Sequence, residues 1–288
     1  MKSRCTAAFL IVLFYSYLWS AQTVGSAGAP GRLLEVDESQ IYYQECGTGT
    51  EAVVLLHDGV VNSAVWDDVW PEFCKRFHTI RYDRRGYGKS PVTKKPYYEA
   101  DDLAALLHDR KISKAAIVAS SHGGQVAMEF ALRYPAQVHE LVLVGPGVTG
   151  FPYSEHFIMR DRGLGQSNKI EELIDASVRD PYLIVAGHDA ARKRLHDLLA
   201  ASPQDLTHDD MPLPEKPIFP NVRQLKMSTL VLIGSGDIAD NEAVAGALVV
   251  TIPNAQRIVV PDVGHLMYLE KPHEFFGLVY KFLTLHGW

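Results

Sequence analysis

A serine within a turn of small residues is the first group in this sequence that could perform covalent chemistry. Residues 117–124 read IVASSHGG, so an apolar run ends at two serines and a helical pattern follows. A serine at a sharp strand-to-helix turn exposes its hydroxyl, but the turn closes only when the residues two positions to either side are small. Ser121 has Ala119 and Gly123 there, whereas Ser120 has two bulkier residues. The spacing therefore favours Ser121 as a nucleophile.

His265 is the histidine best placed to act as the base for this serine. A serine hydroxyl becomes an effective nucleophile when a neighbouring base takes its proton, and histidine suits this task because its pKa lies near neutrality. Among the twelve histidines, His265 follows a late apolar run through a Val-Gly pair and precedes the last helical pattern. A histidine on such a loop can reach the carboxyl edge of a sheet, so we predict His265 as the general base.

The base also needs a carboxylate that orients its ring and stabilises the imidazolium. Asp237 follows the apolar run 229–234 and is our predicted acid. Asp240 lies three residues further on and remains an alternative, because a sequence does not reveal the geometry of this loop. Asp262 precedes His265, and we interpret it as a residue that caps or solvates its own loop.

Five segments together resemble the α/β-hydrolase superfamily, and the resemblance covers nearly everything after residue 32. Their order of serine, then aspartate, then histidine is the order of that family. The resemblance implies a Ser121, Asp237 and His265 triad. The five segments are the turn around Ser121, His57-Asp58-Gly59 with Trp66 further on, the turn DRRGYGKS at 83–90, Gly234-Ser235-Gly236-Asp237, and Gly264-His265.

The same resemblance implies an oxyanion hole made of two backbone N–H groups. One belongs to His122, directly after the nucleophile. The other comes from the residue after a His-Gly pair, but here Asp58 occupies the glycine position. We therefore expect Gly59 to supply the second N–H, with Val60 as the alternative. A carboxylate at position 58 would oppose an oxyanion unless its side chain points away.

These groups can meet only if a parallel sheet brings several loops to one edge. Short apolar runs alternate with helical patterns, which predicts such a sheet with right-handed crossovers. The first two runs are joined by the tight turn Asp37-Glu38-Ser39 and are predicted to be antiparallel. The predicted strands are 33–36, 41–46, 52–57, 78–83, 115–120, 138–144, 229–234 and 255–260, and the predicted helices are 64–77, 97–109, 123–134 and 272–285.

The strand–helix alternation is interrupted between about residues 147 and 226. We therefore assign residues 30–147 and 226–288 to an α/β-hydrolase core and 148–225 to a helical lid over the carboxyl edge, where open α/β sheets bind ligands. Apolar lid residues are expected to line the acyl pocket. The candidates are Phe151, Phe157 and Leu164.

Residues 1–29 have the arrangement of a secretory signal peptide. Lys2 and Arg4 precede an apolar run over 7–19, and small residues follow. We expect a secreted, periplasmic or cell-envelope protein with no membrane span in its mature form, and a retained N-terminal anchor is the alternative. Export would leave Cys46 and Cys74. Whether they pair is left open, and pairing is the less favoured alternative because a domain of this size does not need a disulfide.

Several function classes find no support in the composition. The formal net charge of -6 and the lack of a basic stripe argue against nucleic-acid binding. No cysteine or histidine spacing typical of a metal site occurs, and we expect no metal and no cofactor. Arg84 and Arg85 lie in a glycine-containing turn, but no Gly-Lys-Ser/Thr helix start follows, so we interpret that turn as structural.

The predicted activity is hydrolysis of a small-molecule carboxylic ester or lactone through an acyl-enzyme. A serine nucleophile argues against the relatives that use an aspartate, the haloalkane dehalogenases and epoxide hydrolases. The alternatives within the fold are a carbon–carbon bond hydrolase and a cofactor-free haloperoxidase, because a fold does not fix a function. A non-catalytic receptor or binding module is a further alternative, and the presence of all three triad residues argues against it.

Overall fold

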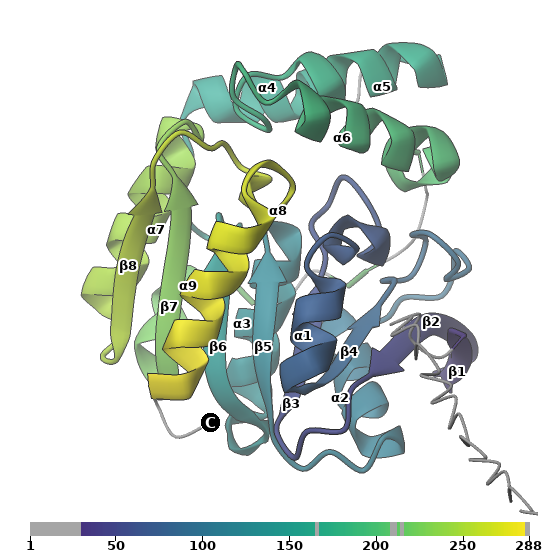
Figure 1. The fold of residues 1–288 in the computed structure, drawn as a ribbon, viewed down its shortest axis with the longest axis vertical. Coiled ribbons are helices and arrows are strands. Elements are labelled where there is room, and N and C mark those ends of the chain that lie inside the picture. Colours follow the sequence, from purple (N-terminus) through teal and green to yellow (C-terminus); the bar gives the residue numbers. More distant parts are fainter. Residues whose placement is uncertain (1–29, 165–166, 208–211, 214–215, 286–288) are drawn as a thin grey trace, which may run out of the picture.

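In the described part of the chain, eight strands form one sheet in the order β1-β2-β4-β3-β5-β6-β7-β8 (Figure 1). The computed structural model describes residues 30–164, 167–207, 212–213 and 216–285, so the predicted export segment 1–29 lies outside the described residues. The strands are β1 (Arg32–Val36), β2 (Ser39–Cys46), β3 (Ala52–Leu56), β4 (His78–Tyr82), β5 (Ala115–Ser120), β6 (Val138–Val144), β7 (Ser228–Gly234) and β8 (Ala255–Val260).

The pairing of these strands brings the carboxyl ends of all of them except β2 to one edge. β1 and β2 are antiparallel, with Val36 opposite Ser39, and the two turn residues Asp37 and Glu38 have φ values of 37° and 58°. Such positive φ values are typical of a two-residue hairpin turn. β2 is also antiparallel to β4, whereas β4, β3, β5, β6, β7 and β8 pair in parallel. The predicted fold class, a mostly parallel sheet flanked by helices, is confirmed.

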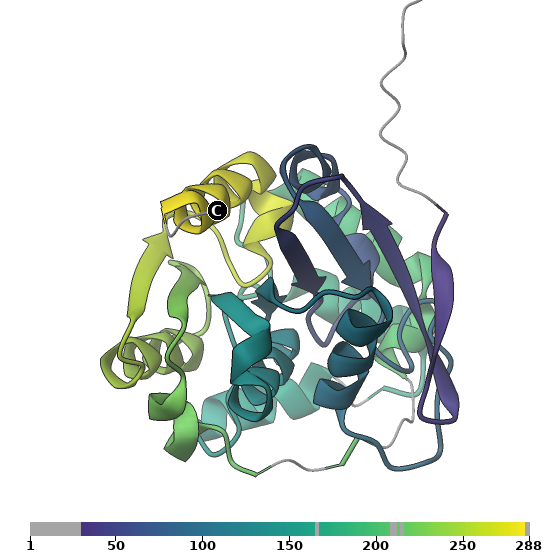
Figure 2. The same cartoon turned by 90° about the horizontal axis from the view of Figure 1, so that it is seen from below.

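Helices cover both faces of the sheet, which explains why its central strands are apolar throughout (Figure 2). On one face the apolar side chains of α2 (Glu99–Asp109), α3 (His122–Arg133) and α7 (Ala239–Thr251) form a cluster with the sheet. On the other face α1 (Trp70–Arg76) and α9 (Pro272–Leu285) contribute to a second cluster. Each residue of β3 and β5 is buried.

A group of helices lies above the carboxyl edge of the sheet, between β6 and β7 in the chain (Figure 1). It consists of α4 (Glu155–Leu164), α5 (Ile170–Arg179) and α6 (Asp189–Ala201), followed by the 3-10 segments η3 (Pro203–Leu206) and η4 (Phe219–Gln224). α6 packs against α8 (Met267–Glu270). Within the described ranges, no helix combines the length and the apolar character needed to cross a membrane.

One predicted helix needs correction, and one helix was missed. The predicted helix 64–77 is two elements, the 3-10 helix η1 (Ser63–Trp66) and α1, and Pro71 lies in the first turn of α1. Proline has no N–H to donate to the preceding turn, so it begins a new helix more readily than it continues one. The other 3-10 segment of the core is η2 (Pro135–Gln137). α7 was not predicted, because its apolar residues do not gather on one face of the helix at the spacing that marks an amphipathic helix.

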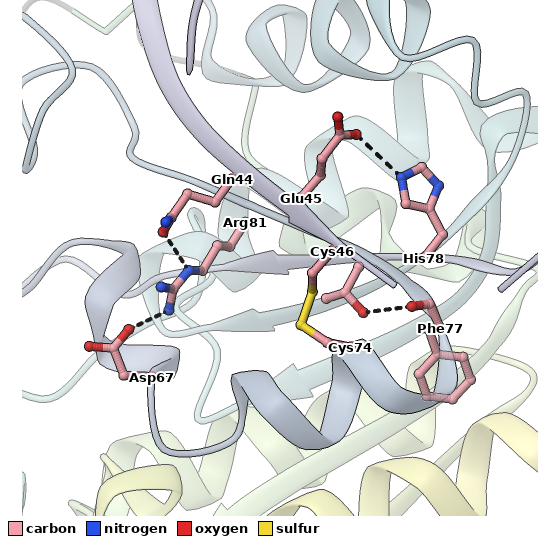
Figure 3. Close-up of a disulfide and its surroundings, with 9 residues drawn as sticks. Gln44, Glu45, Cys46, Asp67, Cys74, Phe77, His78 and Arg81 are labelled. Atoms are coloured by element: carbon pink, nitrogen blue, oxygen red, sulfur yellow. Dashed lines mark hydrogen bonds and ion pairs between the residues drawn. A yellow bond between two sulfur atoms is a disulfide. The ribbon is translucent and has the colours of Figure 1, made fainter. Parts of the chain in front are cut away.

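Cys46 and Cys74 form a disulfide, the outcome that the sequence left open and made the less favoured one (Figure 3). Their Cα atoms lie 5.2 Å apart. Cys46 ends β2 opposite Thr79 of β4, and the helix that carries Cys74 runs directly into β4. The two cysteines therefore meet at the same end of the sheet, which their separation of 28 residues in the sequence did not reveal.

Candidate active site

Ser121 occupies a strained turn between β5 and α3. Its φ of 51° and ψ of -117° lie in a region that residues other than glycine rarely adopt. The turn closes because Gly123 has no side chain: a Cβ atom at this position would collide with the carbonyl oxygen of His57. The neighbouring Ser120 is fully buried, and its hydroxyl lies 3.0 Å from the hydroxyl of Tyr268. The structure therefore gives the two serines different environments, and Ser121 is the more accessible one.

Asp237 and His265 lie in contact at the carboxyl edge of the sheet. The Oδ2 atom of Asp237 is 2.8 Å from Nδ1 of His265, and the two side chains are only 1% and 8% exposed. The other carboxylate oxygen of Asp237 accepts hydrogen bonds from the Ile238 N–H at 2.7 Å and from the Asn241 amide at 2.9 Å. With Nδ1 facing the carboxylate, Nε2 of His265 points to the opposite side of the ring.

The end of β6 contacts both the turn at Ser121 and the loop of His265. The Ser121 N–H donates to the carbonyl of Val144 at 2.9 Å. Gly145, the next residue, has a φ of 49°, and a Cβ on it would lie only 2.8 Å from Nδ1 of His265. Glycine is therefore required here for two reasons, its backbone conformation and the proximity of the imidazole.

The pKa of His265 is raised above its ordinary value. Burial would lower this pKa because it disfavours the charged form, but the charge of Asp237 and its hydrogen bond outweigh that effect. The charge of Asp58 also raises the pKa of His265, whereas the charge of Arg160 on α4 lowers it. The imidazole can therefore hold a proton taken from a serine hydroxyl more readily than a histidine in water.

The two loops predicted to form an oxyanion hole are neighbours. A Cβ on Gly59 would lie 3.5 Å from the Cβ of His122. In the described part of the chain, the Gly59 N–H donates to no protein acceptor, whereas the Val60 N–H donates to Oδ1 of Asp58 at 2.6 Å. The His122 N–H belongs to the first turn of α3, where N–H groups have no acceptor within the helix. Val60, the alternative donor, already has a partner.

The DRRGYGKS turn supports the loop that carries Gly59. The Arg84 N–H donates to Nε2 of His57 at 2.9 Å, and the Arg84 guanidinium donates to the Asp58 carbonyl at 2.7 Å. The Tyr87 hydroxyl donates to the Gly59 carbonyl at 3.1 Å. Burial and the charge of Arg84 hold the pKa of His57 well below its ordinary value, so this histidine is a neutral acceptor.

A polar group beside Ser121, formed by Glu99, Arg84 and His122, was not anticipated from the sequence. Glu99, at the start of α2, lies 2.7 Å from Nε2 of His122 and 2.7 Å from Nη1 of Arg84. Burial would raise the pKa of Glu99, but these two partners outweigh it and hold the pKa far below the ordinary range. A cavity of about 180 Å³ lies beside this group, and Glu99 and His122 are among its lining residues. No local pattern marks Glu99, because its partners lie on two other segments.

The three lid residues predicted to line the acyl pocket have different settings. Phe157 of α4 stacks on Tyr153, with ring centroids 4.3 Å apart. Phe151 contacts Phe219 edge to face at 5.1 Å and packs against the sheet cluster. The Leu164 side chain lies outside the described residues. Phe151 and Phe157 thus belong to one aromatic group at the base of the lid, and their role in a pocket stays a prediction.

The comparisons with known proteins agree with this architecture. A sequence model described as the alpha/beta hydrolase family matches residues 53–278. The chain is 30% identical to a 2-hydroxy-6-oxononadienedioate/2-hydroxy-6-oxononatrienedioate hydrolase of Burkholderia vietnamiensis, over 85% of this chain and 91% of that protein. A solved thermophilic esterase from Thermogutta terrifontis is similar with a TM-score of 0.76 at 25% identity, over 90% of this chain and 99% of that chain.

A third comparison concerns the fold alone. The enol-lactonase from Burkholderia xenovorans is similar with a TM-score of 0.74 at 22% identity, over 88% of this chain and all (100%) of that one. The family match extends over far more than half of the sequence and includes Ser121, Asp237 and His265. By this match, together with the sheet order and the turn at Ser121, the chain belongs to the alpha/beta hydrolase family.

Proposed function

We propose that this protein is a serine hydrolase that cleaves carboxylic esters or lactones, with Ser121 as nucleophile, His265 as general base and Asp237 as the orienting acid. The observation that carries the proposal is the 2.8 Å contact between Asp237 and His265, beside the strained turn that presents Ser121. A nucleophile, a base and a group that orients the base form the arrangement that acyl transfer requires.

The reaction follows from the roles of these groups. The Ser121 hydroxyl attacks the ester carbonyl while Nε2 of His265 takes its proton, and Asp237 stabilises the imidazolium. The N–H groups of Gly59 and His122 stabilise the oxyanion, and loss of one such donor typically costs about 10²–10³ in kcat. His265 then protonates the leaving alkoxide, and a water that it activates hydrolyses the acyl-enzyme.

A carbon–carbon bond hydrolase is the second candidate, because several curated relatives carry such names. The same triad could attack a ketone carbonyl, but the leaving group would then be a carbanion. An alkoxide leaving group needs only a proton from His265, whereas a carbanion also needs an electron sink in the substrate. The groups at this site suffice for esters and lactones, so we prefer that class over carbon–carbon cleavage and over the cofactor-free haloperoxidase alternative.

A substrate panel with a labelling experiment tests the proposal. A fluorophosphonate probe is expected to label the wild type and Ser120→Ala but not Ser121→Ala. Ser121→Ala is also expected to lower turnover of nitrophenyl esters and lactones by about a thousandfold or more. Turnover of a 2-hydroxy-6-oxo-dienoate with none of esters or lactones would favour the second candidate. Absence of both labelling and turnover would favour a binding module instead.

We also propose that the chain is exported, with residues 1–29 as the signal. The Cys46–Cys74 disulfide supports this proposal, because disulfides persist in oxidising compartments and are rare where thiols are kept reduced. Cell fractionation followed by N-terminal sequencing of the accumulated protein tests it. The exported protein is expected to have its N-terminus within residues 25–30. Accumulation of the uncleaved chain in the compartment where thiols are kept reduced would contradict export.

A further inference from the structure

Asp58 lies where the family resemblance places a glycine, and both of its carboxylate oxygens have partners. Oδ1 accepts hydrogen bonds from the N–H groups of Val60 at 2.6 Å and Val61 at 3.0 Å. Oδ2 accepts one from the Tyr268 hydroxyl at 2.7 Å. Asp58 is fully buried. A buried carboxylate destabilises a protein unless it is hydrogen-bonded in this manner.

Tyr268 connects this carboxylate to the two other loops of the site. It is fully buried and lies three residues after His265. Its hydroxyl also lies 3.0 Å from the hydroxyl of Ser120, the residue before the proposed nucleophile. Burial, and secondarily the charge of Asp58, raise the pKa of Tyr268 well above its ordinary value, so the hydroxyl remains protonated and can donate. One chain of hydrogen bonds thus joins the loops of Gly59, Ser121 and His265.

The partners of Asp58 also determine which N–H groups of its loop remain available. The carboxylate accepts hydrogen bonds from the N–H groups of Val60 and Val61. The N–H of Gly59, the residue between Asp58 and Val60, has no protein acceptor in the described ranges. An aspartate that bonds to N–H groups two and three residues ahead fixes the backbone of a tight turn. The direction of the Gly59 N–H therefore depends on the Asp58 side chain.

We propose that Asp58 is a positioning residue for the oxyanion hole, and that the Tyr268 hydroxyl holds its carboxylate in place. The inference rests on the proposed function, since it concerns how the Gly59 N–H is aimed. Both oxygens of Asp58 are directed to the Val60 and Val61 N–H groups and to the Tyr268 hydroxyl, so neither takes the Gly59 N–H from an oxyanion. Misplacement of a reacting group by about 1 Å can cost about 10²-fold in rate, so this turn has ample effect on catalysis.

Four variants test the proposal with nitrophenyl ester as substrate: Asp58→Ala, Asp58→Asn, Tyr268→Phe and Ser120→Ala. Asp58→Ala removes all three bonds and is expected to lower kcat by about 10- to 100-fold, with KM changed less than about twofold. In Asp58→Asn the amide oxygen still accepts the two N–H groups, so kcat is expected within a few-fold of the wild type. Tyr268→Phe is expected to fall between the two, and Ser120→Ala close to the wild type.

Leu248→Ala serves as the control for lost stability. Leu248 lies in the second half of α7 and is fully buried in the cluster that this helix forms with the sheet, two turns beyond Asn241. Loss of a buried leucine side chain destabilises a fold, so this variant is expected to lower the melting temperature and leave kcat unchanged below the melt. If Asp58→Ala fails to fold, Tyr268→Phe and Asp58→Asn carry the same comparison.

A second readout does not depend on turnover. Hydrogen exchange of the peptide that contains Gly59 to Val61 is expected to be faster in Asp58→Ala than in the wild type and nearly unchanged in Asp58→Asn. Unchanged kcat and exchange in Asp58→Ala, or equal losses of kcat in Asp58→Ala and Asp58→Asn, would overturn the inference while the proposed function stands. A wild type that neither reacts with the probe nor hydrolyses esters would instead refute the proposed function.

Discussion

Asp240 binds Ser154, the residue directly before α4. Its two carboxylate oxygens accept hydrogen bonds from the Ser154 N–H at 2.6 Å and the Ser154 hydroxyl at 2.7 Å, immediately before α4 begins. Asp237, three residues earlier, binds His265 instead. The predicted acid and its alternative therefore face different segments, Asp237 the imidazole and Asp240 the residue before α4.

This separation predicts different consequences for the same chemical change. Asp237→Asn is expected to lower kcat by about 10³–10⁴, because the amide can hold His265 in the wrong tautomer. Asp240→Asn is expected to change kcat by less than about threefold, because the amide oxygen can still accept from Ser154. Steady-state kinetics at saturating ester, with thermal melts as folding control, compare the two. A large loss in Asp240→Asn beside a normal Asp237→Asn would reverse the assignment.

The raised pKa of His265 predicts the pH dependence of hydrolysis. The base must be neutral to take the serine proton, so kcat/KM is expected to fall as pH drops through a pKa above the ordinary histidine value of about 6.5. Asp237→Asn removes the charge that raises this pKa, and burial then dominates. The midpoint of its residual activity is expected at lower pH, and identical midpoints in both proteins would contradict this explanation.

The raised pKa of His265 also makes the stability of the fold depend on pH. The folded-state pKa of His265 exceeds the unfolded-state value, so the interaction with Asp237 stabilises the fold below the unfolded-state pKa. This contribution is lost as pH rises through the folded-state pKa. Urea melts of the wild type and His265→Ala across this window are expected to converge toward high pH.

The disulfide predicts a redox-dependent stability. Its loop of about 28 residues corresponds to about 3–4 kcal/mol in the chain-entropy model of disulfides. Reductant, or the double change Cys46→Ala with Cys74→Ala, is expected to lower the free energy of unfolding by up to this amount. Urea melts with and without reductant measure the effect. The double variant is the control, because its stability should not respond to reductant. If the stability of the wild type did not respond to reductant either, the prediction would be wrong.

We predict that substitutions of the three lid residues change the selectivity for ester chain length more than the rate of the chemical step. Phe151→Ala, Phe157→Ala and Leu164→Ala are expected to alter the relative kcat/KM across a series of ester chain lengths, because apolar side chains determine the size of a pocket. Met159→Ala provides a control on the same helix, since Met159 is 57% exposed. If the three lid variants kept the wild-type chain-length profile as the control does, these residues would not form the pocket wall.

Local patterns predicted several elements closely. The strands 115–120, 138–144 and 255–260 and the helix 272–285 have the predicted bounds, because apolar runs between turn residues mark such elements directly. The prediction was poorer where a local signal is weak or divided. Proline divides the helix predicted over 64–77, and α7 lacks the periodic spacing that would reveal it.

The sequence by itself determined the alternation of strands and helices and the turn at Ser121, because apolar runs and the small residues at 119 and 123 are local signals. Only the tertiary structure decided which aspartate meets His265, whether Cys46 and Cys74 join, and where the Asp58 carboxylate points. Each of these depends on side chains that are distant in the sequence. Asp58 and Tyr268, for example, are separated by 210 residues, yet the sheet edge brings them to 2.7 Å. Such contacts follow from how parallel strands are ordered in space, which no local pattern encodes.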